Sequence, residues 1–166
     1  MSAARRLLLF FLLLSFAKLA AADLVHYEGH VVGVADGDTI TVLDKHKVQH
    51  KVRLMGIDAP EKSQPFGKVS RQHLAARVFS KAVTIEYAKL DRYRREIGKV
   101  LVSGVDANLE QVEAGLAWHY KKYAREQTAK DRAAYSLAEE RARSLKVGLW
   151  RDDEPIAPWD FRRSQR

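Results

Sequence analysis

The stretch that decides the fold is VVGVADGDTITVLDKHKVQHKVRLMGIDAPE, residues 31–61. Apolar and polar residues alternate in three runs separated by turn residues, which predicts strand, turn, strand, turn, strand. The first turn contains the Asp-Gly pair at 36–37, which is typical of hairpins because glycine accepts the positive φ of a tight turn. We therefore expect Asp38 at the mouth of a sheet, with the next strand bringing Asp58 and Glu61 back to the same end.

The rest of the chain predicts further strands separated by helices. We expect five strands in all, at residues 27–35, 40–43, 48–57, 83–87 and 97–102. Glycines at positions 29 and 33 suggest bends or bulges in the first strand. Five short strands, with one helix after the third and two near the end, indicate an α+β protein with a mainly β core, a small closed barrel that carries three helices.

Apolar spacing and capping residues place the three helices. The first is marked by the apolar residues of one face, Val69, Leu74, Ala75, Val78 and Ala82. Asp106 or Asn108 can cap a short second helix that stops at Gly115. The third helix is expected over residues 128–145, where Ala, Arg and Glu are frequent.

Residues 1–22 have the pattern of a signal peptide. Two arginines precede an apolar run at residues 7–17 that is too short to span a bilayer, and three alanines at 20–22 form a small-residue cleavage signal. Cleavage after Ala22 is expected, which predicts a secreted or periplasmic protein with no stable membrane association. The alternative is an uncleaved membrane anchor, against which Lys18 interrupts the apolar run.

The balance of charges makes the chain basic. It has 166 residues, with 29 basic and 21 acidic side chains and a net charge of +8. Residues 1–22 contain three of the basic residues and no acidic one, so the mature chain would carry +5. A basic surface favours polyanions, although a merely soluble cationic protein has the same signature. The length suits one domain, and the absence of cysteine excludes a disulfide scaffold.

We expect three segments, a signal peptide at residues 1–22, one folded domain at residues 23–150 and a basic C-terminal tail at residues 151–166. The tail ends in Arg162-Arg163-Ser164-Gln165-Arg166. We expect these last residues to be disordered and to add electrostatic attraction to polyanions without specificity.

Asp38 and Asp58 are the candidate metal ligands. Pro60 disfavours the helical conformation at Ala59 and limits where the Ala59 carbonyl can point, so this carbonyl is a candidate third ligand. Two carboxylates and one carbonyl would leave most positions around a calcium ion to water and substrate. The competing interpretation is that Asp38 serves the turn and Asp58 a loop, because Asp and Gly are ordinary turn residues.

Glu61 and Arg53 complete the candidate site. Glu61 follows Asp58 by three residues, where a carboxylate close to a metal ion could accept a proton from an attacking water. A helix-capping or surface role is the alternative for Glu61. Arg53 interrupts an apolar strand, and at the end of a sheet its guanidinium could hold phosphate oxygens. An outward-facing residue of a half-exposed strand would show the same pattern.

Two further groups of residues combine positive charge with aromatic rings. Arg92-Tyr93-Arg94-Arg95 is a basic cluster of the kind that contacts nucleic acids, although solvated basic loops are commoner. Trp118, Tyr120 and Tyr123 are interleaved with lysines, a pattern that can stack bases and hold the phosphates of a single strand. Packing in the core is the expected role of Trp118.

Together these motifs resemble the staphylococcal nuclease-like (thermonuclease) family. The resemblance rests on Asp36-Gly37-Asp38-Thr39, Val52-Arg53-Leu54, Ile57-Asp58-Ala59-Pro60-Glu61, Asp91-Arg92-Tyr93 with Arg95, and Gly115-Leu116-Ala117, in that order. It covers about residues 29–150. It implies an OB-fold barrel and a calcium-dependent nuclease that hydrolyses phosphodiester bonds of DNA and RNA to products with a 3′ phosphate.

The resemblance also implies roles for single residues. The metal, one Ca²⁺ or another divalent ion, would be held by Asp38, Asp58 and the Ala59 carbonyl. Glu61 matches the general base, Arg53 and Arg95 match the phosphate-binding arginines, and Arg92, Tyr93 and Tyr123 match nucleotide-contacting positions. The implied partners are DNA and RNA, with single strands favoured, bound by a monomer.

The chain departs from the best-known member of that family at two positions. Ala59 replaces a threonine, which a backbone carbonyl ligand tolerates. Arg94 stands at a glycine position, so we expect the loop before Arg95 to avoid the left-handed conformation that favours glycine.

Two other functions compete with a nuclease. An OB-fold nucleic acid-binding module without catalysis is the first, and such a protein has no use for the complete set Asp38, Asp58, Glu61, Arg53 and Arg95. The second is an exported cationic protein that acts on anionic membranes. The acidic residues mixed through the helix from Thr128 disfavour that reading.

Overall fold

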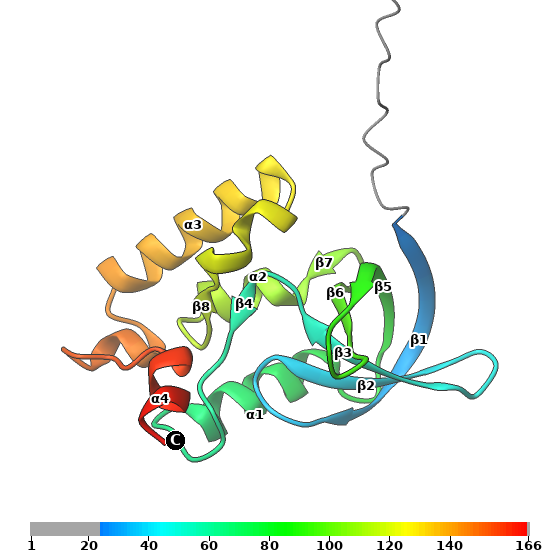
Figure 1. The fold of residues 1–166 in the computed structure, drawn as a ribbon, viewed down its shortest axis with the longest axis horizontal. Coiled ribbons are helices and arrows are strands. Elements are labelled where there is room, and N and C mark those ends of the chain that lie inside the picture. The colour runs from blue at the N-terminus through cyan, green and yellow to red at the C-terminus, as the bar shows by residue number, and fades with distance from the viewer. Residues whose placement is uncertain (1–23, 166) are drawn as a thin grey trace, which may run out of the picture.

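The computed structural model of the protein describes residues 24–165 (Figure 1), so the expected signal peptide at residues 1–22 lies outside the described residues, as does Arg166. The strands are β1 (Val25–Val34), β2 (Thr39–Asp44), β3 (Gln49–Leu54), β4 (Ile57–Asp58), β5 (Ala82–Leu90), β6 (Glu96–Val102), β7 (Val105–Asp106) and β8 (Trp118–His119). The helices are α1 (Gly67–Val78), α2 (Ala107–Glu113), α3 (Ala129–Ser144) and α4 (Pro158–Ser164), with 3₁₀ turns η1 (Lys121–Glu126) and η2 (Gly148–Arg151). In this part of the chain no helix is long and apolar enough to cross a membrane.

Strands β1, β2, β3, β5 and β6 form a closed barrel. The sheet order is β3-β2-β1-β5-β6-β7, and a parallel pairing between β3 and β6 closes it. Figure 1 shows the barrel on one side of the molecule and α3 and α4 on the other, with the β4–β8 pair between them. The predicted fold class, an α+β barrel that carries helices, is confirmed.

Alternation along the strands builds the barrel core. Side chains that face inward are almost fully buried, among them Val31, Ile40, Val42, Val52, Ile85 and Val100. In β3 the buried Val52 and Leu54 flank Arg53, whose side chain is only partly buried. The pleat therefore turns Arg53 away from the apolar interior, because successive side chains of a strand point to opposite faces.

The turn between β1 and β2 positions Asp38 for a different reason from the one expected. Gly37 does not have a positive φ; instead a Cβ atom at this position would overlap the Ser70 side chain and come within 2.7 Å of the Ala59 Cβ. The Asp36 carboxylate accepts a hydrogen bond from the Asp38 amide at 3.1 Å and tightens the turn. Glycine is required here for close packing against α1 and not for a left-handed backbone.

The strand predicted at residues 48–57 is interrupted. Gly56 adopts a φ of 79°, which ends β3 and separates it from β4. Strand β4 then leaves the barrel and pairs with β8, with Asp58 opposite Trp118. This break carries Asp58 away from the barrel wall and toward the helical side of the molecule.

The first helix is placed correctly, and the predicted Leu74 and Val78 are buried, but two other residues of the predicted face are not part of it. Its buried residues are Gly67, Ser70, Leu74 and Val78. Val69 is 49% exposed and Ala82 belongs to β5, so both were wrongly assigned to the apolar face. Small side chains were overlooked because the pattern was scored on apolarity, whereas Ser70 is buried through its hydrogen bond to the Leu116 carbonyl at 2.7 Å.

Capping residues set the ends of α2, as expected, and also the start of α3. The Asp106 carboxylate accepts hydrogen bonds from the amides of Asn108 and Leu109, and Gly115 follows α2 with a φ of 63°. The Thr128 hydroxyl accepts a hydrogen bond from the Asp131 amide at 3.0 Å and begins α3. These local signals are sufficient because a cap satisfies amides within its own first turn.

The C-terminal residues correct the expectation of a disordered tail. Residues 158–164 form α4, with Pro158 in its first turn. Ala157 and Pro158 are buried, and the Gln64 side-chain amide donates a hydrogen bond to the Ile156 carbonyl at 2.6 Å. The charge of this segment suggested solvation, but its apolar residues dock it against the folded domain.

Candidate active site

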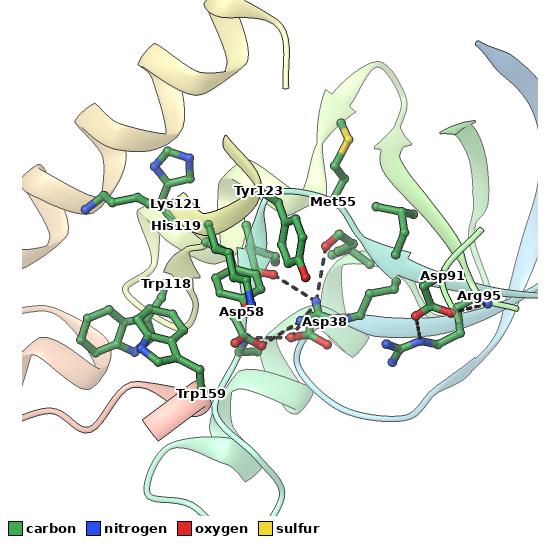
Figure 2. Close-up of a pocket in the computed structure, with 18 of the residues that line it drawn as sticks. Asp38, Met55, Asp58, Asp91, Arg95, Trp118, His119, Lys121, Tyr123 and Trp159 are labelled. Atoms are coloured by element: carbon green, nitrogen blue, oxygen red, sulfur yellow. Dashed lines mark hydrogen bonds and ion pairs between the residues drawn. The ribbon is translucent and has the colours of Figure 1, made fainter. Parts of the chain in front are cut away.

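One pocket of about 1160 Å³ opens where the barrel meets the helices (Figure 2). It is lined by the ends of β3 and β4, by the loop at residues 91–95, by β8 and η1, and by α4. The structure places all nine predicted site residues around it: Asp38, Arg53, Asp58, Ala59, Glu61, Arg92, Tyr93, Arg95 and Tyr123. The fold therefore brings the predicted residues together, while their chemical roles stay predictions.

Asp38 is fixed at the floor of this pocket. Its side chain is buried, and one carboxylate oxygen accepts a hydrogen bond from the Ala59 amide at 2.7 Å. The Gln111 side-chain amide donates to the neighbouring Gly37 carbonyl at 2.7 Å and ties the turn to α2. The Asp38 side chain and its turn are thus held by residues outside their own hairpin, which fixes their orientation before any ligand arrives.

Arg53 joins the two buried aspartates. Its Nη1 lies 2.9 Å from the Asp38 Oδ2, and its Nη2 lies 2.8 Å from the Asp58 Oδ1. Nη1 also donates to the Ile57 carbonyl at 3.1 Å. A planar guanidinium with donors on several edges can bridge two acids in this way, whereas the single ammonium of lysine could not reach both with fixed geometry.

The two aspartates form a buried and poorly solvated pair. Asp58 is 1% exposed and Asp38 is 5% exposed. Burial raises the pKa of Asp38 to about 8, even though Arg53 beside it lowers this pKa. Additional positive charge between the two carboxylates would favour their ionised forms, because buried charges are tolerated only when they are paired.

Glu61 and Arg162 meet at the mouth of the pocket. The Glu61 carboxylate is partly exposed and accepts a hydrogen bond from the Arg162 Nη1 at 2.7 Å. The Arg162 Nη2 lies 2.8 Å from the Asp58 Oδ2. The hydrogen bond to Asp58 raises the pKa of Arg162 above its ordinary value, so this guanidinium stays charged. Arg162 was not among the predicted site residues.

The loop at residues 91–95 holds Arg95 away from the aspartates. The Arg95 Nε donates to the Asp91 carboxylate at 2.8 Å, and Figure 2 shows this pair at a distance from Asp38 and Asp58. Arg94 adopts a φ of 62°, so the expectation that it would avoid the left-handed conformation was wrong. The Asp91 carboxylate accepts hydrogen bonds from the amides of Tyr93 and Arg95, and these bonds stabilise the turn around Arg94.

The same hydrogen bonds set the charge of this loop. Burial raises the pKa of Asp91, but hydrogen bonds from the amide and the guanidinium of Arg95 outweigh it and hold the pKa of Asp91 below its usual value. Arg92 and Arg95 both lie over the Tyr93 ring, with guanidinium carbons 4.8 Å and 5.5 Å from its centroid. The exposed Tyr93 ring thus carries two cations at the edge of the pocket.

Aromatic rings line the opposite wall. The Tyr120 and Tyr123 rings meet edge to face with centroids 5.1 Å apart, and Tyr123 is 43% exposed. Trp118 packs on Trp150 with centroids 4.4 Å apart, in a small hydrophobic cluster with Ala142 and Leu149. It is therefore partly buried by packing, as expected, and also lines the pocket. Such rings can stack on the bases of a single strand.

Comparison with known proteins decides the family. Residues 51–152 match the model of the staphylococcal nuclease homologue family. The chain belongs to this family. A Haemophilus influenzae protein described as an uncharacterized endonuclease is 40% identical over 162 residues, which cover 98% of this chain and 88% of the relative.

Two further relatives of the staphylococcal nuclease family extend the comparison. Protein ParB of Escherichia coli is 39% identical over 160 residues, covering 90% of this chain and 87% of its own length. The micrococcal nuclease of Shigella flexneri is 36% identical over 149 residues, covering 84% of this chain and 83% of its own length. These matches extend over most of each protein and so concern the whole domain.

The pocket offers oxygen ligands to a hard cation, but few of them come from acidic side chains. Within residues 24–165 no group of three or more His, Cys, Asp or Glu side chains is placed to hold a metal ion. A site of the predicted kind, with the carboxylates of Asp38 and Asp58, would need a backbone oxygen and water as further ligands. Oxygen ligands of this kind suit Ca²⁺ or Mg²⁺, and the buried acids gain from a cation.

The helix that carries Arg162 could have been predicted from a local signal. A proline at the start, an acid in the first turn and two arginines in the last turn are typical of a short helix, and residues 158–164 have all three. The contact with the site could not have been found in this way. Arg162 and Glu61 are 101 positions apart in the chain, and no periodicity links them.

Proposed function

We propose that the chain is an exported, calcium-dependent nuclease that hydrolyses phosphodiester bonds of DNA and RNA. Nuclease activity is supported by membership of the staphylococcal nuclease family and by relatives described as an endonuclease and a micrococcal nuclease. The observation that carries the proposal is the arrangement of Asp38 and Asp58, two buried acids bridged by Arg53 in a pocket that Glu61 also lines.

In this proposal Asp38, Asp58 and the Ala59 carbonyl hold the cation. A bound divalent cation would neutralise charge on the phosphate and lower the pKa of a nearby water. Arg53 keeps N–H donors beyond those that the two acids use, and these can bind phosphate oxygens as negative charge builds on phosphorus. Its side chain is 14% exposed, so it donates from a largely desolvated position where hydrogen bonds to charged groups are strong.

Glu61 is proposed to take the proton of the attacking water. Its side chain is 38% exposed, so water reaches it from the mouth of the pocket. The oxygen of that water bonds to phosphorus as its proton passes to Glu61, the bond from phosphorus to the 5′ oxygen breaks, and the leaving 5′ oxygen takes a proton from solvent. The product strand then ends in a 3′ phosphate. A positioned base in this place contributes a factor of about 10² to 10⁴.

The basic loop and the aromatic wall are proposed to hold the strand on either side of the reacting phosphate. Arg92, Tyr93 and Arg95 line one margin, and Tyr123 lies on the other with the Lys89 and Lys122 ammonium groups each 5.7 Å from its ring centroid. Bases can stack on these rings only when they are not paired in a duplex, so we propose that single strands are favoured.

Removal of the metal is the direct test of this function. The mature protein should degrade single-stranded DNA and RNA when Ca²⁺ is present, and a chelator should stop the reaction because the two buried acids would lose their cation. Cleavage is measured on end-labelled strands, with Ca²⁺ added back as the control. Binding of the strands without any cleavage would favour the non-catalytic binding module, and equal cleavage in chelator would exclude the metal.

Export is a separate part of the proposal and rests on residues 1–22. Protein recovered from the periplasm or the medium should begin at Asp23, because the alanines at 20–22 precede the expected cleavage point. Sequencing of the N-terminus of the recovered protein measures this. Protein that keeps Met1 and stays with the membrane fraction would instead support the uncleaved anchor.

A further inference from the structure

Helix α4 places a positive charge where the proposed cation would lie. The Arg162 guanidinium contacts both oxygens of Asp58, with Nη2 2.8 Å from Oδ2 and Nη1 3.3 Å from Oδ1. Nη1 also donates to Glu61 at 2.7 Å. Asp58 already pairs with Arg53, so both its oxygens are occupied by guanidinium groups. A proposed metal ligand and the proposed base are thus neutralised by the chain itself.

The same helix covers the aromatic wall. The Trp159 ring stacks on Tyr120 with centroids 5.3 Å apart and planes inclined by 13°. It also meets Trp118 edge to face, with centroids 5.5 Å apart, and Figure 2 shows the two indoles together beside Asp58. One face of Tyr120 is therefore taken by a ring of the protein, at the place where an unpaired base would stack. Two independent contacts of α4 compete with two parts of a substrate.

The attachment of α4 is separate from the barrel core. The helix has seven residues and lies near the end of the chain. Residues 151–154, which lead to it, are exposed, and Ile156 is 57% exposed. The buried residues of the barrel core cluster include none from α4. A short element that is joined through exposed residues and has no part in the core opens at a lower free energy than the core does.

We propose that α4 is an autoinhibitory cap, in which Arg162 occupies the cation position at Asp58 and Glu61 and must leave before a divalent cation and a phosphate enter. This proposal rests on the proposed nuclease function and adds its regulation. The Asp58 carboxylate cannot hold a cation with both oxygens while Arg162 uses them. Binding of cation and opening of α4 are therefore linked, and each must favour the other to the same extent.

The linkage sets the size of the expected effect. When only the open form binds, the apparent dissociation constant is the intrinsic one divided by the open fraction. An open form populated to about 10% would weaken apparent Ca²⁺ binding about tenfold. Loss of the Arg162 charge removes the main contact that holds the closed form, so most of this factor should be recovered.

The first experiment measures Ca²⁺ affinity in the full chain without nucleic acid. Arg162→Gln should bind Ca²⁺ about tenfold more tightly than the unmodified protein in a calorimetric titration. Arg151→Gln is the matched control, because Arg151 is exposed, lies in η2 outside the pocket and removes the same charge. Equal or weaker Ca²⁺ binding by Arg162→Gln would overturn the cap and make Arg162 a structural support of the acids.

The second experiment follows α4 itself and does not depend on activity. Hydrogen exchange of the amides at residues 158–164 should become faster when Ca²⁺ is added to the unmodified protein. Trp159→Ala, which removes no group that contacts a carboxylate, should speed the same exchange without Ca²⁺ and tighten Ca²⁺ binding. If Ca²⁺ binds while the amides of α4 stay equally protected from exchange, the cap proposal is wrong. This result is obtained with the unmodified protein, so it does not depend on whether Arg162→Gln folds.

Failure of the cap and failure of the nuclease give different results. If the cap is wrong, the unmodified protein still cleaves with Ca²⁺, and Arg162→Gln gains neither affinity nor rate at low Ca²⁺. If the nuclease is wrong, no variant cleaves at any Ca²⁺ concentration, while the affinities and the exchange of α4 still decide whether the cap exists.

Discussion

Replacement of Glu61 by glutamine should lower kcat by a factor of about 10² to 10⁴, because an amide cannot take a proton from the attacking water. The change keeps the size of the side chain, and the Glu61 amide keeps its hydrogen bond to the Gln64 side chain at 3.1 Å. Binding of a single-stranded oligonucleotide with Ca²⁺ should be nearly unchanged, since Asp38, Asp58 and Arg53 remain. Single-turnover cleavage and an equilibrium binding titration measure the two quantities separately.

Glu113→Gln is the matched control for this change. Glu113 is exposed at the end of α2 and does not line the pocket, so its loss of charge should leave kcat unaltered. Because Glu61 also pairs with Arg162, the Glu61→Gln experiment is best done at saturating Ca²⁺, where the proposed cap is open. Unchanged turnover in Glu61→Gln under these conditions would remove Glu61 from the role of base.

Local patterns were enough to predict the barrel and the floor of the site. Alternation around Val52 and Leu54 identified the buried face, and the turn before β2 delivered Asp38 to the pocket. Such features depend on residues close in sequence and on a period of two, which a single sequence displays. Gly37 shows the limit of this reading, since its position was predicted correctly for the wrong reason and only the packing against Ser70 explains it.

One local feature and one contact between distant segments were not predicted from the sequence. Arg94 could enter the left-handed region because the Asp91 carboxylate accepts two amide hydrogen bonds within the same turn. Arg162 was assigned to a disordered tail on charge alone, although Trp159 beside it supplies the apolar surface that docks the helix. Charge composition describes solubility and steering, and it does not exclude that a basic segment folds onto an acidic site.

Replacement of Arg53 by glutamine should affect both stability and catalysis. The guanidinium pairs with two buried aspartates, and in the proposed reaction it also binds the phosphate. In the free protein it pairs with Asp38 and Asp58, and its loss leaves buried carboxylates without that partner. Breaking a buried pair by removing one member costs about 3–5 kcal/mol of unfolding free energy. In the reaction its donors would bind the phosphate, and loss of one such group lowers kcat by about 10² to 10³.

Calcium should separate these two effects of Arg53. A ligand that binds only the folded protein adds about 2.7 kcal/mol at 100 times its dissociation constant, so saturating Ca²⁺ should restore much of the stability of Arg53→Gln in urea unfolding. It should not restore kcat, because a cation beside Asp38 and Asp58 does not replace donors on the phosphate. Arg71→Gln is the control: Arg71 lies outside the pocket and donates to the Val34 carbonyl at 2.9 Å, so its loss should cost about 0.5–1.5 kcal/mol and leave kcat unchanged. Recovery of both stability and turnover with Ca²⁺ would reduce Arg53 to a counter-ion of the acids, and the phosphate would then have to be held by other residues of the pocket.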